Sequence, residues 1–160
     1  MCSIFGIFDL QPGDDLAGLR RLALECSQRQ RHRGPDWSGV FVDTGVILVH
    51  ERLAIVDPAS GAQPLRSRDG ALALAVNGEI YNHADLRAAS AYDFTSGSDC
   101  EAINALYRDG DEPVQWIARL NGIFAFALWD GAAQRYLIAR DPLGVCPLYW
   151  GHDRQGRLCV

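Results

Sequence analysis

Short apolar runs, separated by turn residues, recur along most of the chain and limit the folds open to it. Residues 3–8 form an alternating apolar segment, which is typical of a buried strand. Further strand candidates lie at residues 40–42, 46–49, 53–56, 71–76, 123–129, 136–139, 148–150 and 158–160. The Asp130-Gly131 turn signal predicts that two of these runs form a hairpin. We therefore expect antiparallel sheets.

Two helices are predicted between the strand candidates. The first carries apolar residues at helical spacing from Leu16 to Cys26. The second begins at a capping box formed by Ser98 and Glu101, which places Asp99 in its first turn. Strands with helices between and after them predict an α+β fold, in which sheets pack on each other and are covered by helices.

Composition excludes several classes of function. A chain of 160 residues that is 48% hydrophobic has the size of one domain. Its formal charge of -5 opposes a nucleic-acid partner, and no apolar run is long enough to span a membrane. The five cysteines form no CxxC pair, and the four histidines lack the spacing of a metal site. We expect a reduced, cytoplasmic protein without a metal.

Cys2 follows Met1 directly, and removal of Met1 would leave a cysteine with both a thiol and a free α-amine. The ordinary pKa values of these groups, ~8.5 and ~7.7 to 8.0, differ by less than about one unit, so proton transfer costs only about 1 kcal/mol. The amine could therefore activate the thiol as a nucleophile. The alternative is an ordinary small apolar residue at the edge of the first strand, and position alone favours it.

Two further segments carry polar groups next to apolar runs. The Asn77-Gly78-Glu79 sequence ends such a run, so that an amide and a glycine N–H emerge together and could hold an oxyanion. The alternative is a plain hairpin turn. Arg52 lies in the apolar strand candidate of HERLAIVD, where its guanidinium needs a carboxylate partner. That partner could be a ligand or a structural acid, either Glu51 or Asp57.

The remaining reactive residues favour structural roles. Cys100 could pair with His50 or His83 as a thiol-imidazole dyad, but it lies in the predicted first helical turn without an orienting partner. His32 lies in RHRGPDWSG, which alone indicates a helix stop and a turn. The other cysteines, which lie on the first helix and in C-terminal strand candidates, are interpreted as packing residues: Cys26, Cys146 and Cys159.

Seven motifs occur in one order along the chain. After Cys2 come RHRGPDWSG, HERLAIVD, NGEIYNH, GSDCE, FAFALWD and RDPLG. In this order the chain resembles a class II glutamine amidotransferase domain, and within that family it is most similar to the glutaminase domain of glutamine-hydrolysing asparagine synthetases. The resemblance covers residues 2–160, and seven ordered motifs are far more specific than any single short pattern.

The resemblance implies an N-terminal nucleophile hydrolase fold, a four-layer αββα sandwich of two antiparallel sheets. It also implies that Cys2 attacks the glutamine carboxamide, forms a γ-glutamyl thioester and releases ammonia without a cofactor. By the motifs, Asn77 and Gly78 would form the oxyanion hole and Arg52 would bind the α-carboxylate. The remaining substrate contacts would be Asp99 and Glu79 at the α-ammonium, and Ile55 and Val56 at the pocket border.

The resemblance also sets expectations about partners. Asparagine synthetases carry a second domain that binds ATP and Mg²⁺ through a glycine-serine loop, and no such loop occurs in residues 2–160. We expect a C-terminally truncated glutaminase domain, active with a synthetase domain or subunit as ammonia acceptor, and the likeness suggests a homodimer. Two alternatives stay open: a sugar phosphate or phosphoribosyl pyrophosphate as acceptor, or a non-catalytic glutamine-binding module if Met1 is retained.

Overall fold

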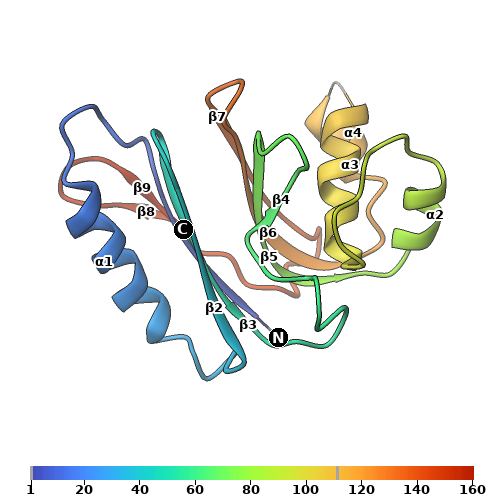
Figure 1. Ribbon diagram of the computed structural model, residues 1–160, viewed down its shortest axis with the longest axis horizontal. Helices are drawn as coiled ribbons and strands as arrows, with labels where there is room; N and C mark the ends of the chain where they lie inside the picture. Colours follow the sequence, from blue (N-terminus) through green and yellow to red (C-terminus); the bar gives the residue numbers. More distant parts are fainter. Residues whose placement is uncertain (1, 111) are drawn as a thin grey trace.

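Two antiparallel sheets stack face to face between helices in this computed structural model, which describes residues 2–110 and 112–160. Helix α1 (Leu16–Gln28) covers the outer face of the first sheet, and the other helices cover the outer face of the second (Figure 1). This arrangement confirms the predicted α+β sandwich with its four αββα layers.

The first sheet has five strands in the order β2-β3-β1-β9-β8. Their bounds are Ser3–Phe8 for β1, Trp37–Asp43 for β2, Val46–Arg52 for β3, Gly151–His152 for β8 and Leu158–Cys159 for β9. Strand β1 runs antiparallel to β3, with Ser3 opposite Glu51 and Phe8 opposite Val46. The start of β1 therefore lies beside the end of β3, which brings Cys2 next to Arg52.

The second sheet has four strands in the order β4-β5-β6-β7. Their bounds are Leu65–Arg66 for β4, Leu72–Ile80 for β5, Gly122–Asp130 for β6 and Arg135–Arg140 for β7. Strands β6 and β7 form the predicted hairpin. Because β4 pairs only with residues 73 and 74, no strand formed by the described residues lies on that side of the second half of β5. That uncovered half carries Gly78.

The helices begin and end where their sequences favour it. The Asp15 carboxylate accepts a hydrogen bond of 2.9 Å from Gly18 N–H and thereby caps α1. The second sheet is covered by α2 (His83–Ala88), the 3₁₀ helix η1 (Asp99–Glu101), α3 (Ala102–Asp109) and α4 (Pro113–Ile117). None of the described helices is both long and apolar enough to cross a membrane.

Three apolar clusters fill the spaces between the layers. The cluster under α1 joins Leu19 and Ala23 to Ile47, and the cluster under the other helices joins Ile103 to Phe126. A third cluster lies between the sheets and consists of Phe8, Val46, Leu48, Ala73, Ala127 and Trp129. Each sheet is therefore apolar on both faces, as a four-layer fold requires.

Two predicted strands are wrong. Residues 53–56 form a loop after β3 ends at Arg52, because the Ala54 N–H donates to the Asp36 carboxylate (2.8 Å) and not to a neighbouring strand. Residues 148–150 are also a loop, in which Tyr149 is 82% exposed and Trp150 is 71% exposed. An apolar run alone does not distinguish a paired strand from a loop.

Two local predictions need correction as well. Strand β5 continues through Asn77 and Gly78, which pair with Ala125 and Phe124, so neither the strand end nor the hairpin turn is observed there. The capping box is wrong too, since Ser98 makes no side-chain cap and Glu101 accepts from the loop before it. Asp99 does lie in the first helical turn, as predicted.

Candidate active site

One cavity, with a volume of about 70 Å³, opens where the ends of β1 and β3 face the uncovered edge of β5. All but one of the predicted site residues line it: Cys2, Arg52, Ile55, Val56, Gly78, Glu79 and Asp99. Asn77 is the exception. The fold thus brings together residues that are up to 97 positions apart in the chain (99 − 2).

Cys2 is half-buried at the mouth of this cavity, immediately before β1. Its Sγ accepts a hydrogen bond from Leu53 N–H at 3.3 Å and lies 3.7 Å from the Leu53 carbonyl oxygen. The Arg33 Nε donates to the Cys2 carbonyl oxygen at 3.1 Å. Burial raises the pKa of the Cys2 thiol, although the Leu53 N–H and the Arg52 charge act in the opposite direction. The predicted removal of Met1 concerns a residue outside the described ones.

Gly78 directs its N–H toward the cavity. The neighbouring residue on the same edge of β5 is Val76, whose N–H donates to Gln63 Oε1 (2.7 Å) and whose carbonyl oxygen contacts His50 Nε2 (2.9 Å). Backbone groups alternate along a strand, so the Gly78 N–H faces this edge too. A Cβ at Gly78 would overlap the Ile123 carbonyl oxygen and lie 2.6 Å from the Phe124 Cα. Only glycine therefore lets β5 and β6 approach so closely here.

Asn77 lies outside the cavity that Cys2 lines. It is 5% exposed and lines a second cavity of about 400 Å³, together with Arg33 and Ser3. Its Oδ1 is buried, and no hydrogen-bond partner for it occurs among residues 2–110 and 112–160. The amide oxygen therefore remains an unused acceptor in this structure.

Arg52 is 7% exposed and forms the positively charged wall of the cavity. Its guanidinium donates to the carbonyl oxygens of Val56 (3.3 Å), Asp57 (2.6 Å) and Pro58 (3.2 Å). Neither carboxylate proposed from sequence as a structural partner serves that role. The Asp57 carboxylate accepts from Ser60 and Gly97, and that of Glu51 accepts from Ser27 and Ser38.

Asp99 and Glu79 place negative charge in the same cavity. Asp99 is 6% exposed, and its Oδ2 accepts a hydrogen bond of 2.7 Å from Ile80 N–H. Glu79 is exposed at the rim. The cavity therefore offers a guanidinium and two carboxylates to a ligand that carries both signs of charge.

The alternative nucleophile finds no support in the geometry. Cys100 is 3% exposed, and its Sγ contacts the Gly78 carbonyl oxygen and Asp99 Oδ2, both at 3.7 Å. Burial raises the pKa of its thiol well above the ordinary range. Burial also lowers the pKa of His50 to about 4, so its imidazole stays neutral at pH 7. All five cysteines are free, and no cluster of metal-ligating side chains occurs in the described parts of the chain.

Sequence reasoning missed three residues that build the site. Arg33 lies in RHRGPDWSG, which was interpreted as a helix stop and a turn, and no role was assigned to Arg33. Asp57 was considered as a carboxylate partner of Arg52, whereas its carboxylate accepts a hydrogen bond from Gly97, 40 positions away. Gln63 carried no signal, because nothing local indicates that its side chain completes the hydrogen bonding of Val76.

Comparison with known proteins finds similarity to glutamine-hydrolysing asparagine synthetases. The chain is 52% identical over 162 residues to asparagine synthetase B [glutamine-hydrolyzing] of Escherichia coli K12, covering 100% of this chain and 28% of that protein. It is 47% identical to a probable asparagine synthetase [glutamine-hydrolyzing] of Dictyostelium discoideum, covering 99% of this chain and 28% of that protein. The chain thus spans little more than a quarter of these relatives. Residues 1–160 match the glutamine amidotransferase domain family, and the chain belongs to that family.

Proposed function

We propose that this chain hydrolyses glutamine to glutamate and ammonia through a γ-glutamyl thioester on Cys2. The observation that carries the proposal is the composition of one cavity, which holds the Cys2 thiol, the Gly78 N–H and, on its walls, Arg52 and Asp99. These are the groups that acyl transfer from an amino-acid amide needs: a nucleophile, an oxyanion donor and a charged group for each end of the substrate.

The reaction begins once removal of Met1 has exposed the Cys2 α-amine. This amine takes the thiol proton, and the Cys2 thiolate attacks the side-chain carboxamide of glutamine to form a C–S bond. As the tetrahedral intermediate collapses, the C–N bond breaks and the proton passes to the departing ammonia. Water then hydrolyses the thioester, releases glutamate and restores the thiol.

The developing oxyanion is stabilised by the Gly78 N–H, which faces the cavity from the uncovered edge of β5. The Asn77 amide is the second donor, because its Nδ2–H group can donate a hydrogen bond and the residue directly precedes Gly78. Each such donor contributes roughly 2.7 to 4 kcal/mol to transition-state stabilisation.

Substrate recognition relies on charge at both ends of the amino acid. The Arg52 guanidinium binds the α-carboxylate, and Asp99, with Glu79, binds the α-ammonium. Ile55 and Val56 border the pocket beside Arg52. A compound without one of these charged ends would leave a charged group of the site unpaired, so the arrangement favours a free amino acid.

The ammonia is supplied to an asparagine synthetase-type ATP-dependent site outside residues 1–160. This part of the proposal rests on the relatives, whose names describe asparagine synthetases that hydrolyse glutamine and which are more than three times as long as this chain. The synthetase domain or subunit is therefore the proposed partner.

The test uses 6-diazo-5-oxo-norleucine, a glutamine analogue that alkylates the nucleophile. The purified protein is incubated with it, its intact mass is recorded and the adduct is mapped by peptide sequencing. We expect one adduct on Cys2 of a chain that lacks Met1, and excess L-glutamine should prevent it. An adduct elsewhere, or none on a folded and trimmed chain, would contradict the proposal.

A further inference from the structure

The groups proposed for the two ends of the substrate come from separate segments. Arg52 ends β3 and is surrounded by the loop of residues 53–61, whereas Asp99 follows the segment of residues 94–98. Both charges must lie at the right separation if one amino acid is to bind them together. Some contact between the two segments must set that separation.

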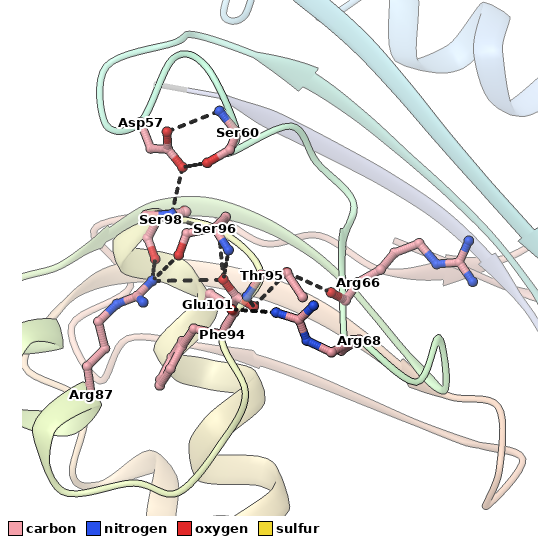
Figure 2. A network of polar contacts seen from close by, with 11 residues as sticks. Asp57, Ser60, Arg66, Arg68, Arg87, Phe94, Thr95, Ser96, Ser98 and Glu101 are labelled. Atoms are coloured by element: carbon pink, nitrogen blue, oxygen red, sulfur yellow. Dashed lines mark hydrogen bonds and ion pairs between the residues drawn. The ribbon is translucent and has the colours of Figure 1, made fainter.

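The Asp57 carboxylate makes this contact (Figure 2). Its Oδ2 accepts a hydrogen bond of 2.7 Å from Gly97 N–H, across the space between the two segments. The same carboxylate accepts from the Ser60 N–H (3.0 Å) and the Ser60 hydroxyl within its own loop. Gly97 allows the close approach, because a Cβ there would lie only 3.3 Å from Asp57 Oδ2.

Asp57 also contacts the other end of the site through its backbone. Its carbonyl oxygen accepts the shortest of the Arg52 hydrogen bonds, at 2.6 Å. The Gly61 N–H donates to the same carbonyl oxygen at 3.0 Å. A single residue thus holds the guanidinium with its main chain and the segment before Asp99 with its side chain.

The segment of residues 94–98 is anchored from below by the fully buried Glu101 (Figure 2). Its carboxylate accepts from the backbone N–H groups of Thr95 and Ser96, each at 2.8 Å. Arg87 donates to the Ser98 carbonyl oxygen at 2.7 Å and lies 3.9 Å from Glu101. The contacts of Glu101 and Arg87 therefore hold the segment that directly precedes Asp99. The Asp57 side chain connects the more exposed loop of residues 53–61 to this segment.

We propose that Asp57 is a positioning residue that sets the distance between Arg52 and Asp99, and thereby selects ligands that carry both an α-carboxylate and an α-ammonium group. The proposal rests on the proposed function for the roles of Arg52 and Asp99. It adds a residue that touches neither the substrate nor the thiol, and it assigns the selectivity for a whole amino acid to a hydrogen bond between two loops.

The test replaces Asp57 by Asn, which removes the negative charge from the acceptor of the Gly97 N–H and leaves one oxygen where the carboxylate uses two, Oδ1 for the Ser60 N–H and Oδ2 for the Gly97 N–H. Losing a hydrogen bond to a charged acceptor should raise KM for L-glutamine about tenfold. The value of kcat should stay within about threefold, because Cys2 and Gly78 are held by strand pairing. Ser60→Ala keeps the bond to Gly97 and should raise KM by less than about threefold.

Asp69→Asn is the matched control. Asp69 also accepts from a serine hydroxyl and a backbone N–H in a turn, namely Ser67 and Ala71. It lines a different cavity, together with Arg108, and makes no contact with the loop of residues 53–61 among the described hydrogen bonds. We expect KM for L-glutamine to remain that of the unsubstituted protein.

The decisive comparison uses glutaramate, which lacks the α-ammonium group and engages the Arg52 end alone. If Asp57 sets a distance, Asp57→Asn should weaken L-glutamine about tenfold and glutaramate less than about threefold. Equal losses for both compounds would mean general damage to the site and would overturn the proposal. An unchanged KM for L-glutamine would also overturn it.

Binding of L-glutamate, measured by titration of the same variants, separates this proposal from the proposed hydrolysis. If the protein binds L-glutamate but hydrolyses no glutamine, the proposed hydrolysis is wrong. The role of Asp57 is then decided by whether Asp57→Asn weakens L-glutamate binding about tenfold. If the protein binds neither L-glutamine nor L-glutamate, both proposals fall. Circular dichroism of each variant shows whether it is folded.

Discussion

The cavity has a reaction end, formed by Cys2 and Gly78, and a recognition end, formed by Arg52 and Asp99, and the two are built by different means. Gly78 lies within a strand and Cys2 immediately precedes one, and both positions follow from the pairing of β1 with β3 and of β5 with β6. Arg52 also belongs to a strand, but its guanidinium is held by loop carbonyls, and the segment before Asp99 is held by the side chains of Asp57 and Glu101. Backbone ladders tolerate side-chain changes, whereas the loops do not. Substitutions should therefore affect chemistry at one end and affinity at the other.

Cys2→Ala should separate the two ends most sharply. Loss of the nucleophile should lower kcat for glutamine hydrolysis by a factor on the order of 10⁶, to background. Binding of L-glutamate should stay within about threefold, because the groups at the recognition end are unchanged. Steady-state ammonia release and titration with L-glutamate measure the two effects. Residual turnover well above background would exclude Cys2 as the nucleophile.

Asn77→Ala tests the second oxyanion donor. Loss of one such donor should lower kcat by about 10²- to 10³-fold and leave KM within about threefold. Asn77 lines the cavity beside the one that holds Cys2, so this effect depends on its amide reaching the oxyanion during the reaction. An unchanged kcat would leave Gly78 as the donor and remove Asn77 from the mechanism.

His50 should make the stability of the folded protein sensitive to acid. Burial lowers its pKa from the ordinary 6.5 to about 4, so between these values the unfolded chain takes up a proton that the folded chain does not. The contribution of His50 to the free energy of unfolding is therefore fully present above pH 6.5. As the pH drops to 4, the free energy of unfolding should fall by about 3 kcal/mol. Urea unfolding at several pH values measures this loss.

The control for this prediction is His50→Gln, which keeps a donor for the Val76 carbonyl oxygen but does not titrate. Its dependence on pH should be flatter than that of the unsubstituted protein by about the same amount. If the two curves run parallel, the acid sensitivity comes from other groups.

Asp99→Asn should produce the smallest of these effects, confined to the recognition end. Removing the charge that faces the substrate ammonium should raise KM for L-glutamine about thirtyfold, which corresponds to about 2 kcal/mol. The asparagine oxygen can still accept from the Ile80 N–H, so the strand edge should be preserved. KM for glutaramate should change by less than about threefold. Equal changes in KM for both compounds would show that Asp99 supports the fold and does not bind the α-ammonium group.

Much of the secondary structure could be predicted from local pattern. The alternation in residues 3–8, the helical spacing after Leu16 and the Asp130-Gly131 turn each correspond to an observed element. The failures share one cause. Residues 53–56 and 148–150 are apolar enough for strands, but whether they pair depends on what lies next to them in space.

The candidate site shows the same limit. The motif order singled out the eight site residues, and all but Asn77 line one cavity. The sequence could not indicate that the Asn77-Gly78 pair lies inside a strand with one edge uncovered, because that edge exists only where β4 stops pairing. It could not indicate either that the Arg52 guanidinium is bound by carbonyls and the Asp57 carboxylate by Gly97.

By itself, the sequence determined the kinds of elements, the family and the residue types that carry charge and nucleophilicity, because these depend on local spacing and on ordered motifs. Only the tertiary structure decided how those residues meet. The strand registers place Cys2 beside Leu53, and the Asp57–Gly97 contact joins segments 40 residues apart. Such contacts are set by the packing of two sheets and two loops, and no local pattern encodes the distance between them.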